Sequence, residues 1–509
     1  MDIKKTLKVS SVLLLSLALL GGCGSKKSSS AADTGTTSKS EAKSTKKTIS
    51  WMSMLHTATA PSGDVQKELE DYTGMKIKFN WIPDASKEEK INAALASKSL
   101  AYIVSLTQID NTTVRKSMGS GMFWDVEPYL KDYPNLAKIS DKTIEASKIN
   151  GHLYGVPFQK PVARYGVLVR QDWLDNLGLE TPHTLKDLAK VAQAFTEDDP
   201  DDNGKKDTVG IVDRSESYNT TFKTLSGFFG AGNIFSVEGN QVEPSFMQPE
   251  FKKAMKWYRN IYKNGWMNSD FTVMAKQDQK NYIAQGKGGI VITGLFDAKN
   301  YLAAAAGTPQ EDKMKWAMIN DMTYDKGSKR YILSDTNGGM GGWLAIPKQN
   351  VKTKADLKVV LKFINDLMDK KPYVLMTEGI KGVHYDINDK GEYEITNEPK
   401  WEQEVQPYAG SRPSEITVSL KYTDANTNKA NKLMAENEKY AVTNPAQSLT
   451  SNTYDTQWST LSEGVSDAYY KYMMGDITMS DFDKAVDQFK SDGGNNIIKE
   501  FTAEYKKNK

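Results

Sequence analysis

One short segment of the chain, DPDDNGKKD, carries oxygen-bearing side chains at relative positions 1, 3, 5 and 9. A glycine stands at position 6, where it permits a sharp turn, and the residue at position 7 can offer its main-chain carbonyl. Because Ca²⁺ prefers six to eight hard oxygen ligands, this spacing predicts a structural calcium loop of the EF-hand type. The predicted ligands are Asp199, Asp201, Asn203, the carbonyl of Lys205, and Asp207.

The motif is incomplete at its far end. A full EF-hand loop has a glutamate at position 12, where this chain has Gly210. Aspartate, asparagine and glycine are also the residues that dominate ordinary turns. The residues therefore leave two interpretations open, a calcium site completed by water or by another carboxylate, and an acidic surface turn.

A second chemical feature lies near the beginning of the chain. Three lysines precede an apolar stretch over residues 9–20, which is too short to cross a bilayer about 30 Å thick, and Leu-Gly-Gly-Cys follows it. Cys23 is the only cysteine in the sequence. This pattern resembles a bacterial lipobox, which predicts that residues 1–22 are removed and Cys23 is lipidated on sulfur. A plain signal peptide and a buried thiol are the alternatives.

Motifs for catalysis are absent from the sequence. It has no Gly-x-Ser-x-Gly elbow, no His-Glu-x-x-His pair and no glycine loop for phosphates or dinucleotides, and its four histidines are scattered singly. A pair of carboxylates that hydrolyses glycosides would leave no sequence signature. We therefore expect no catalytic residues, and a binding protein rather than an enzyme.

Aromatic side chains offer a different chemistry. Flat indole faces stack on the apolar C–H faces of sugar rings, and several of the ten tryptophans fall in predicted loops or at strand ends. A glycine-rich segment before one of them would let the backbone approach a ligand or another strand closely. For any single tryptophan a place in the core is the more common outcome, and the glycine-rich approach raises Trp343 above the others. The candidate ligand-binding residues are Trp51, His56, Trp124, Tyr154, Asn337 and Trp343.

Size and charge exclude some classes of protein. The chain has 509 residues, 66 basic and 64 acidic side chains, and 39% hydrophobic residues, which is enough for two or three cores. The predicted signal contains three of the lysines and one aspartate, so the mature chain has no net formal charge. A nucleic-acid-binding protein would normally carry a basic excess. With no cysteine left for disulfides, stability must come from core size and perhaps from a metal ion.

The pattern of elements is that of an α/β protein. After Cys23, residues 24–47 are rich in serine, threonine and lysine, which predicts a flexible tether with a reach of about 25–30 Å. Strand and helix patterns then alternate from residue 48 to residue 106, which is typical of a parallel sheet. Amphipathic helices are predicted over 184–196, 249–264 and 354–368, and over 459–474, 479–491 and 495–507 near the end of the chain.

Several short stretches resemble one family. They are WDVEPY from Trp124, GVP from Gly155, RQDWL from Arg170 followed by LGL from Leu177, the calcium loop with Thr208, PEFK from Pro249, and Gly493-Gly494 with Glu500. With the lipobox, they identify the chain as similar to family 1 extracellular solute-binding lipoproteins of ABC importers, in the branch of the alginate-oligosaccharide binders. The resemblance departs from that branch at Thr208, where the branch has a glutamate, and at residues 99–102, which read SLAY in place of Asp-Leu-Pro-Asp.

The resemblance implies two α/β lobes joined by crossing strands, with a ligand cleft and a hinge between them and a helical C-terminal region. It implies a first lobe over residues 48–160 and about 337–395. The second lobe would hold residues 161–336 and 396–509. The ligand would bind at the carboxyl ends of strands, between lobes that close about the hinge.

The function implied is capture of an oligosaccharide by a monomer anchored through Cys23 to the outer face of the cell membrane. The bound sugar would pass to the membrane subunits of an ABC permease. A peptide-binding lipoprotein of the same kind, with a charged cleft that grips chain termini, is the first alternative. A surface carbohydrate-active enzyme is the second, and turnover of the sugar would distinguish it.

Overall fold

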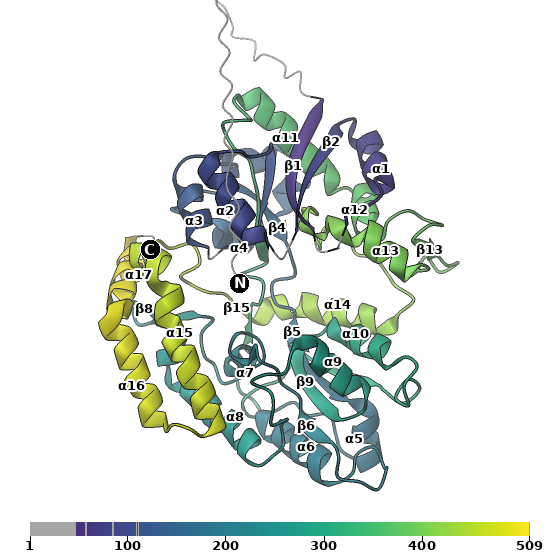
Figure 1. Cartoon of the computed structure of the whole chain (residues 1–509), viewed down its shortest axis with the longest axis vertical. Coiled ribbons are helices and arrows are strands. Elements are labelled where there is room, and N and C mark those ends of the chain that lie inside the picture. The colour runs from purple at the N-terminus through teal and green to yellow at the C-terminus, as the bar shows by residue number, and fades with distance from the viewer. Residues whose placement is uncertain are drawn as a thin grey trace, which may run out of the picture. The chain divides into compact units, whose positions relative to one another are not determined.

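The computed structural model describes residues 47–55, 57, 59–83, 86–107, 109 and 111–507 (Figure 1). The predicted signal, Cys23, residues 24–46 of the tether and His56 lie outside these residues. Among the described residues, no helix combines the length and the apolar character needed to cross a membrane.

The first sheet has five strands in the order β2-β1-β3-β12-β4. β1 pairs in parallel with β2 and β3, as the alternating pattern of the first sixty ordered residues predicts. β12 arrives from far along the chain and enters antiparallel between β3 and β4. Successive residues face opposite sides of the sheet, so that Ile103 and Val104 enter different cores. The strands are β1 (Thr48–Leu55), β2 (Lys76–Pro83), β3 (Ile103–Leu106), β4 (Gly155–Gln159) and β12 (Met340–Ala345).

Helices follow the strands of this sheet in the alternation typical of α/β folds (Figure 1). They are α1 (Asp64–Thr73), α2 (Lys87–Ser97), α3 (Thr112–Gly119), α4 (Asp141–Ser147), α11 (Lys354–Leu367), α12 (Lys370–Thr377) and α13 (Glu398–Glu404). α2 falls within the alternation of strand and helix patterns predicted for residues 48–106. Residues 398–410, which the prediction assigned to the second lobe, pack against the first sheet instead, because Val405 and Tyr408 are buried in its core.

The second sheet has four strands in the order β10-β5-β9-β6. Here β6 and β9 are parallel, and β5 is antiparallel to both of its neighbours, β9 and β10. The strands are β5 (Tyr165–Arg170), β6 (Val209–Ile211), β9 (Gly288–Gly294) and β10 (Trp316–Ile319). The helices around them are α5 (Gln171–Leu177), α6 (Leu185–Glu197), α7 (Thr221–Phe228), α8 (Pro249–Lys263), α9 (Lys276–Ala284) and α10 (Asp297–Ala305).

The rest of the chain is mainly helical, as predicted for the C-terminal region. α15 packs against α16, α17 and α8, and it also contacts α3 beside the first sheet (Figure 1). The helices are α14 (Ala425–Asn437), α15 (Asn452–Met474), α16 (Met479–Phe489) and α17 (Asn495–Lys507). Three small pairings complete the fold, β7 (Phe235–Glu238) with β8 (Gln241–Pro244), β11 (Ile332–Leu333) with β15 (Ala441–Val442), and β13 (Tyr385–Ile387) with β14 (Tyr393–Ile395).

Two segments that run between the sheets are bonded to each other. One joins β4 to β5, and the other joins β11 to β12. Arg164 donates to Asp335 from its main-chain nitrogen and from Nε, each at 2.8 Å. The Ser334 and Thr336 hydroxyls both donate to the carbonyl of Val162. These bonds tie the two crossing segments together between the two sheets.

Candidate ligand-binding grooves

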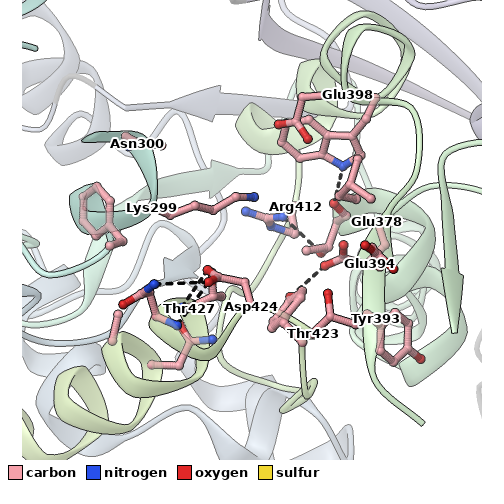
Figure 2. A pocket seen from close by; sticks show the side chains of 18 residues that line it. Lys299, Asn300, Glu378, Tyr393, Glu394, Glu398, Arg412, Thr423, Asp424 and Thr427 are labelled. Carbon is pink, nitrogen blue, oxygen red and sulfur yellow. Dashed lines mark hydrogen bonds between the residues drawn. The ribbon is translucent and has the colours of Figure 1, made fainter. Parts of the chain in front are cut away.

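The first groove lies between α10, beside the second sheet, and the elements α12, α13, β14 and the start of α14, and it has a volume of about 620 Å³ (Figure 2). We call it the Arg412 groove. Lys299, on α10, extends toward the Arg412 guanidinium from the opposite wall (Figure 2). Arg412 donates from Nη1 to Thr377 Oγ1 at 3.0 Å and from Nη2 to Glu415 Oε1 at 3.4 Å. The aromatic side chains of Trp401, Tyr393 and Tyr422 contribute to the lining.

The acidic groups of the Arg412 groove differ in their environments. Glu378 accepts from the Tyr422 hydroxyl at 2.7 Å, and burial raises the pKa of Glu378. Asp424 caps α14 and accepts from the main-chain nitrogens of Asn426 and Thr427. These bonds outweigh the effect of burial and lower the pKa of Asp424. Glu394 and Glu398 are exposed.

A second groove, of about 850 Å³, lies where the segment after β3 faces the segment after β6 and the first half of α15. We call it the Trp458 groove. Thr107 and Asn111 line it from the first sheet, and Tyr218 and Asn219 from the second. Ligands of α/β proteins characteristically bind at the carboxyl ends of strands, and β3 and β6 both end here.

The lining of the Trp458 groove is mostly neutral and polar. Trp458 is partly exposed, and its ring packs on Phe235 with centroids 5.1 Å apart. Asn92 also lines the groove, and its Oδ1 is buried with no hydrogen-bond partner among the described residues. Buried amide oxygens normally have a donor. Gln457, Ser459 and Ser462 add amide and hydroxyl groups.

The sequence-predicted aromatic residues are not brought together in either groove. Trp51 is 0% exposed and Trp343 1%; the first donates from Nε1 to Ser105 Oγ at 3.0 Å and the second to the carbonyl of Ser147 at 2.8 Å. An indole with no exposed face cannot stack on a sugar, so both assignments were wrong. The glycines before Trp343 let the backbone come close to a neighbouring strand rather than to a ligand. A Cβ on Gly342 would lie 2.3 Å from the carbonyl oxygen of Leu106 on β3.

The other predicted ligand-binding residues have three different locations. Trp124 and the buried Tyr154 lie where β12 ends and β4 begins, at the edge of the sheet away from the carboxyl end of β3. Neither lines a groove described above, so the structure does not support their assignment. Asn337 is half-buried in a crossing segment, in the left-handed region with φ of 52°. His56 lies outside the described residues.

Sequence reasoning missed Trp458 and Arg412. The helix predicted over residues 459–474 begins one residue after Trp458. In the structure the corresponding helix, α15, starts at Asn452 behind the cap Ser451. The serine cap was the signal that would have placed Trp458 on the helix. Arg412 lies between elements and has no periodic signal.

The predicted calcium loop joins α6 to β6, as expected. Asn203 Nδ2 lies 2.9 Å from Asp201 Oδ2 and 3.2 Å from Asp207 Oδ1, and Asp199 accepts from the main-chain nitrogen of Gly204 at 2.8 Å. The side chains therefore converge. Among the described residues, however, no group of three or more Asp, Glu, His or Cys side chains is arranged to hold a metal ion.

Two positions of this loop explain its departure from the full motif. A Cβ on Gly210 would lie 2.4 Å from the carbonyl oxygen of Ala192, so the packing of β6 on α6 excludes a glutamate at position 12. Thr208 points inward and donates to the carbonyl of Phe195 at 2.8 Å, so it offers the loop no ligand. Asp201 Oδ1 is buried without a hydrogen-bond partner. Burial, the bond to Asp199 and the charge of Asp207 raise the pKa of Asp201.

Comparison with known proteins agrees with this architecture. The family model for bacterial extracellular solute-binding proteins matches residues 59–371. The chain is 38% identical over 505 residues to the polygalacturonan/rhamnogalacturonan-binding protein YtcQ of Bacillus subtilis (strain 168), and 31% identical over 507 residues to lipoprotein LipO of the same organism. Each alignment covers 98% of both chains.

A solved structure of the alginate-binding protein AlgQ2 without calcium ion superposes with a TM-score of 0.66 at 19% identity, over 91% of this chain and 99% of that one. This likeness confirms the predicted two-lobed α/β fold. YtcQ and AlgQ2 are both named as binding proteins. The resemblance found in the sequence is also confirmed, since the family model covers more than half of the residues. The chain belongs to the bacterial extracellular solute-binding proteins.

Proposed function

We propose that this protein captures an oligosaccharide outside the cell and delivers it to the membrane subunits of an ABC permease. The observation that carries the proposal is the pair of grooves lined from both sheets, in which partly exposed aromatic rings stand beside amides and hydroxyls. Indole and phenol faces suit the C–H faces of sugars, and amides and hydroxyls suit their rims. YtcQ is named for binding polygalacturonan and rhamnogalacturonan, so galacturonate-containing oligosaccharides are the first class to test.

Closure of the lobes would complete the site. Each groove takes residues from both lobes, so a sugar held by both walls would favour the closed arrangement over the open one. The crossing segments bonded through Arg164 and Asp335 are the expected hinge. The permease would then distinguish loaded from empty protein by shape. Isothermal titration calorimetry with galacturonate-containing oligosaccharides tests capture, and failure of every oligosaccharide to bind would refute it.

Trp458→Ala is expected to weaken oligosaccharide binding at least tenfold, because it removes the partly exposed indole from the Trp458 groove. Calorimetry well below the melting temperature measures the change, since the ring also packs in the core. Trp124→Ala is the matched control, as that indole is also partly buried and donates to the carbonyl of Val351 at the far edge of the first sheet. Equal losses in the two variants would contradict the assignment.

We also propose that Cys23 carries the lipid anchor, on the basis of the lipobox-like sequence and the similarity to lipoprotein LipO. Stable anchoring needs more than one attached chain, as when sulfur and the new amino terminus are both acylated. In cells that express Cys23→Ser, we expect the protein in the medium or unprocessed. Labelling with a fatty acid checks this, and a variant that still incorporates lipid would refute the anchor.

We propose that the loop at residues 199–207 binds a calcium ion as a structural ligand, on the basis of the oxygen spacing in its sequence. The orphaned oxygen of Asp201 and its raised pKa mark a place where negative charge lacks compensation, and a divalent cation would supply it. Asp199, Asp201, Asn203, the carbonyl of Lys205, and Asp207 would hold the ion, with water completing the shell. The AlgQ2 structure is described as being without calcium ion, which makes the test worthwhile.

Chelation of calcium is expected to lower the melting temperature by several degrees, because an ion at a hundred times its dissociation constant stabilises the folded state by about 2.7 kcal/mol. Differential scanning calorimetry with calcium and with chelator measures the shift. Asp201→Asn should abolish the response, and Asp202→Asn, next to the predicted ligands, should keep it. Identical melting with and without chelator would exclude the ion.

A further inference from the structure

The described residues that line the Trp458 groove include no lysine, arginine or histidine. The charged side chains of this lining are two carboxylates, Glu88 on α2 and Glu463 on α15, and both residues are exposed. The other polar groups of the lining are amides and hydroxyls. The described lining therefore holds two negative charges with no positive charge to balance them.

Two cations lie near this groove without lining it. Arg115 lies behind Tyr454, with its guanidinium 5.9 Å from the centre of that ring, and it is already paired with Asp455. Lys223 lines an adjoining pocket of about 210 Å³, which shares Trp458 with the groove. A negative group that entered the Trp458 groove would therefore lose part of its water shell with no cation in the described lining to pair with.

The two carboxylates suit a neutral sugar. A sugar hydroxyl can donate to a carboxylate, and such charge-assisted hydrogen bonds are stronger than those between neutral groups. Glu463 makes no hydrogen bond or ion pair with another described residue, so its oxygens are available to a ligand. One oxygen of Glu88 already accepts from Asn111 Nδ2 at 2.9 Å. The carboxylate of a uronate has no hydrogen to donate to either glutamate at neutral pH.

We infer that the Trp458 groove takes a neutral hexose unit, whose hydroxyls donate to Glu463, and that it discriminates against a uronate in the same place. The inference rests on the proposed function and adds the class of sugar unit that this groove accepts. An oligosaccharide with both kinds of unit would place a neutral one here. Glu463 is the specificity-determining residue to vary, because Glu88 also holds Asn111, the cap of α3.

The test is isothermal titration calorimetry with trigalacturonate, its methyl ester, and the galactotriose obtained by reducing its carboxyl groups, which differ only at the sixth carbon of each ring. The wild-type protein should bind galactotriose about tenfold more tightly than trigalacturonate, with the ester between them. Glu463→Gln should narrow that ratio about threefold, because it removes a negative charge and keeps an acceptor. Asp476→Asn is the control for net charge, since this exposed residue follows α15, about 20 Å along the helix from Glu463.

The outcomes separate the two proposals. Equal or tighter binding of trigalacturonate by the wild-type protein, or equal ratios in Glu463→Gln and Asp476→Asn, would overturn the neutral site and leave oligosaccharide capture standing. A ratio that stays the same in Trp458→Ala would place the discrimination outside this groove and overturn the inference. Capture of another oligosaccharide without binding of galactotriose would do so as well. If no oligosaccharide binds, the proposed function fails and the neutral site with it.

Discussion

Asp213→Ala is expected to lower the free energy of unfolding by about 3–5 kcal/mol and to weaken ligand binding as well. Asp213 follows β6 and is 0% exposed. Its carboxylate accepts from the main-chain nitrogen of Arg214 at 2.8 Å, from the Tyr258 hydroxyl at 2.8 Å, and from the Ser217 hydroxyl. Alanine would leave the Arg214 nitrogen and the Tyr258 hydroxyl without this acceptor, at a cost of about 1–3 kcal/mol each, whereas the Ser217 hydroxyl also lies 3.0 Å from the Tyr469 hydroxyl.

Asp213→Ala should weaken ligand binding because Asp213 holds a turn whose residues line the Trp458 groove. Ser217 begins the single 3₁₀ turn that ends at Asn219, and Tyr218 and Asn219 line the Trp458 groove. Removing the acceptor of Ser217 should loosen that turn. Urea unfolding gives the stability change, and calorimetry at a temperature where the variant is folded gives the affinity.

Asp213→Asn is the informative companion variant. Burial raises the pKa of Asp213, which means that the site tolerates a neutral side chain of this shape better than an isolated carboxylate. The amide keeps one acceptor and can donate to the hydroxyls of Ser217 and Tyr258 if they rotate. We therefore expect a loss of about 1–2 kcal/mol. An Asn variant as unstable as the Ala variant would show that the negative charge itself is required.

Local patterns in the sequence predicted individual helices and strands better than the order in which the strands assemble into sheets. The helix over residues 184–196 is α6, capped by Thr184, because its apolar residues recur at helical spacing behind a threonine whose oxygen accepts from the nitrogen of Asp187. The place of β12 between β3 and β4 has no local signal. It depends on a register between Trp343 and Leu106, which lie more than two hundred residues apart in the chain.

The site was harder to predict than the fold for the same reason. Tryptophan suits the proposed sugar site, but exposure decides which tryptophans can reach a ligand, and exposure depends on distant packing. Trp51 stacks on Phe79 inside the first core, with ring centroids 5.6 Å apart. Trp458 is left partly open because α15 lies beside elements of both sheets. Nothing near Arg412 in sequence shows that Lys299 will face it.

Arg115→Met is expected to destabilise the protein by about 2–4 kcal/mol and to detach the start of α15 from α3. Arg115 is 4% exposed, and its Nε donates to Asp455 at 2.7 Å. Its Nη2 donates to the carbonyl of Leu449 at 3.3 Å, and the Thr112 hydroxyl donates to the carbonyl of Asp455. The pair therefore joins a helix of the first lobe to the helix that carries Trp458.

A double-mutant cycle with Asp455→Ala measures the coupling, which should be a large part of the loss in each single variant. Hydrogen exchange should show lost protection in the first turns of α15 and little change in α16. Lys484→Met is the control, because its ion pair with Asp481 is exposed and its removal should leave the melting temperature unchanged. Additive losses in the cycle would mean that Arg115 and Asp455 stabilise the protein separately. α15 would then be held against the first lobe by packing alone, and the Trp458 groove would keep its shape without the ion pair.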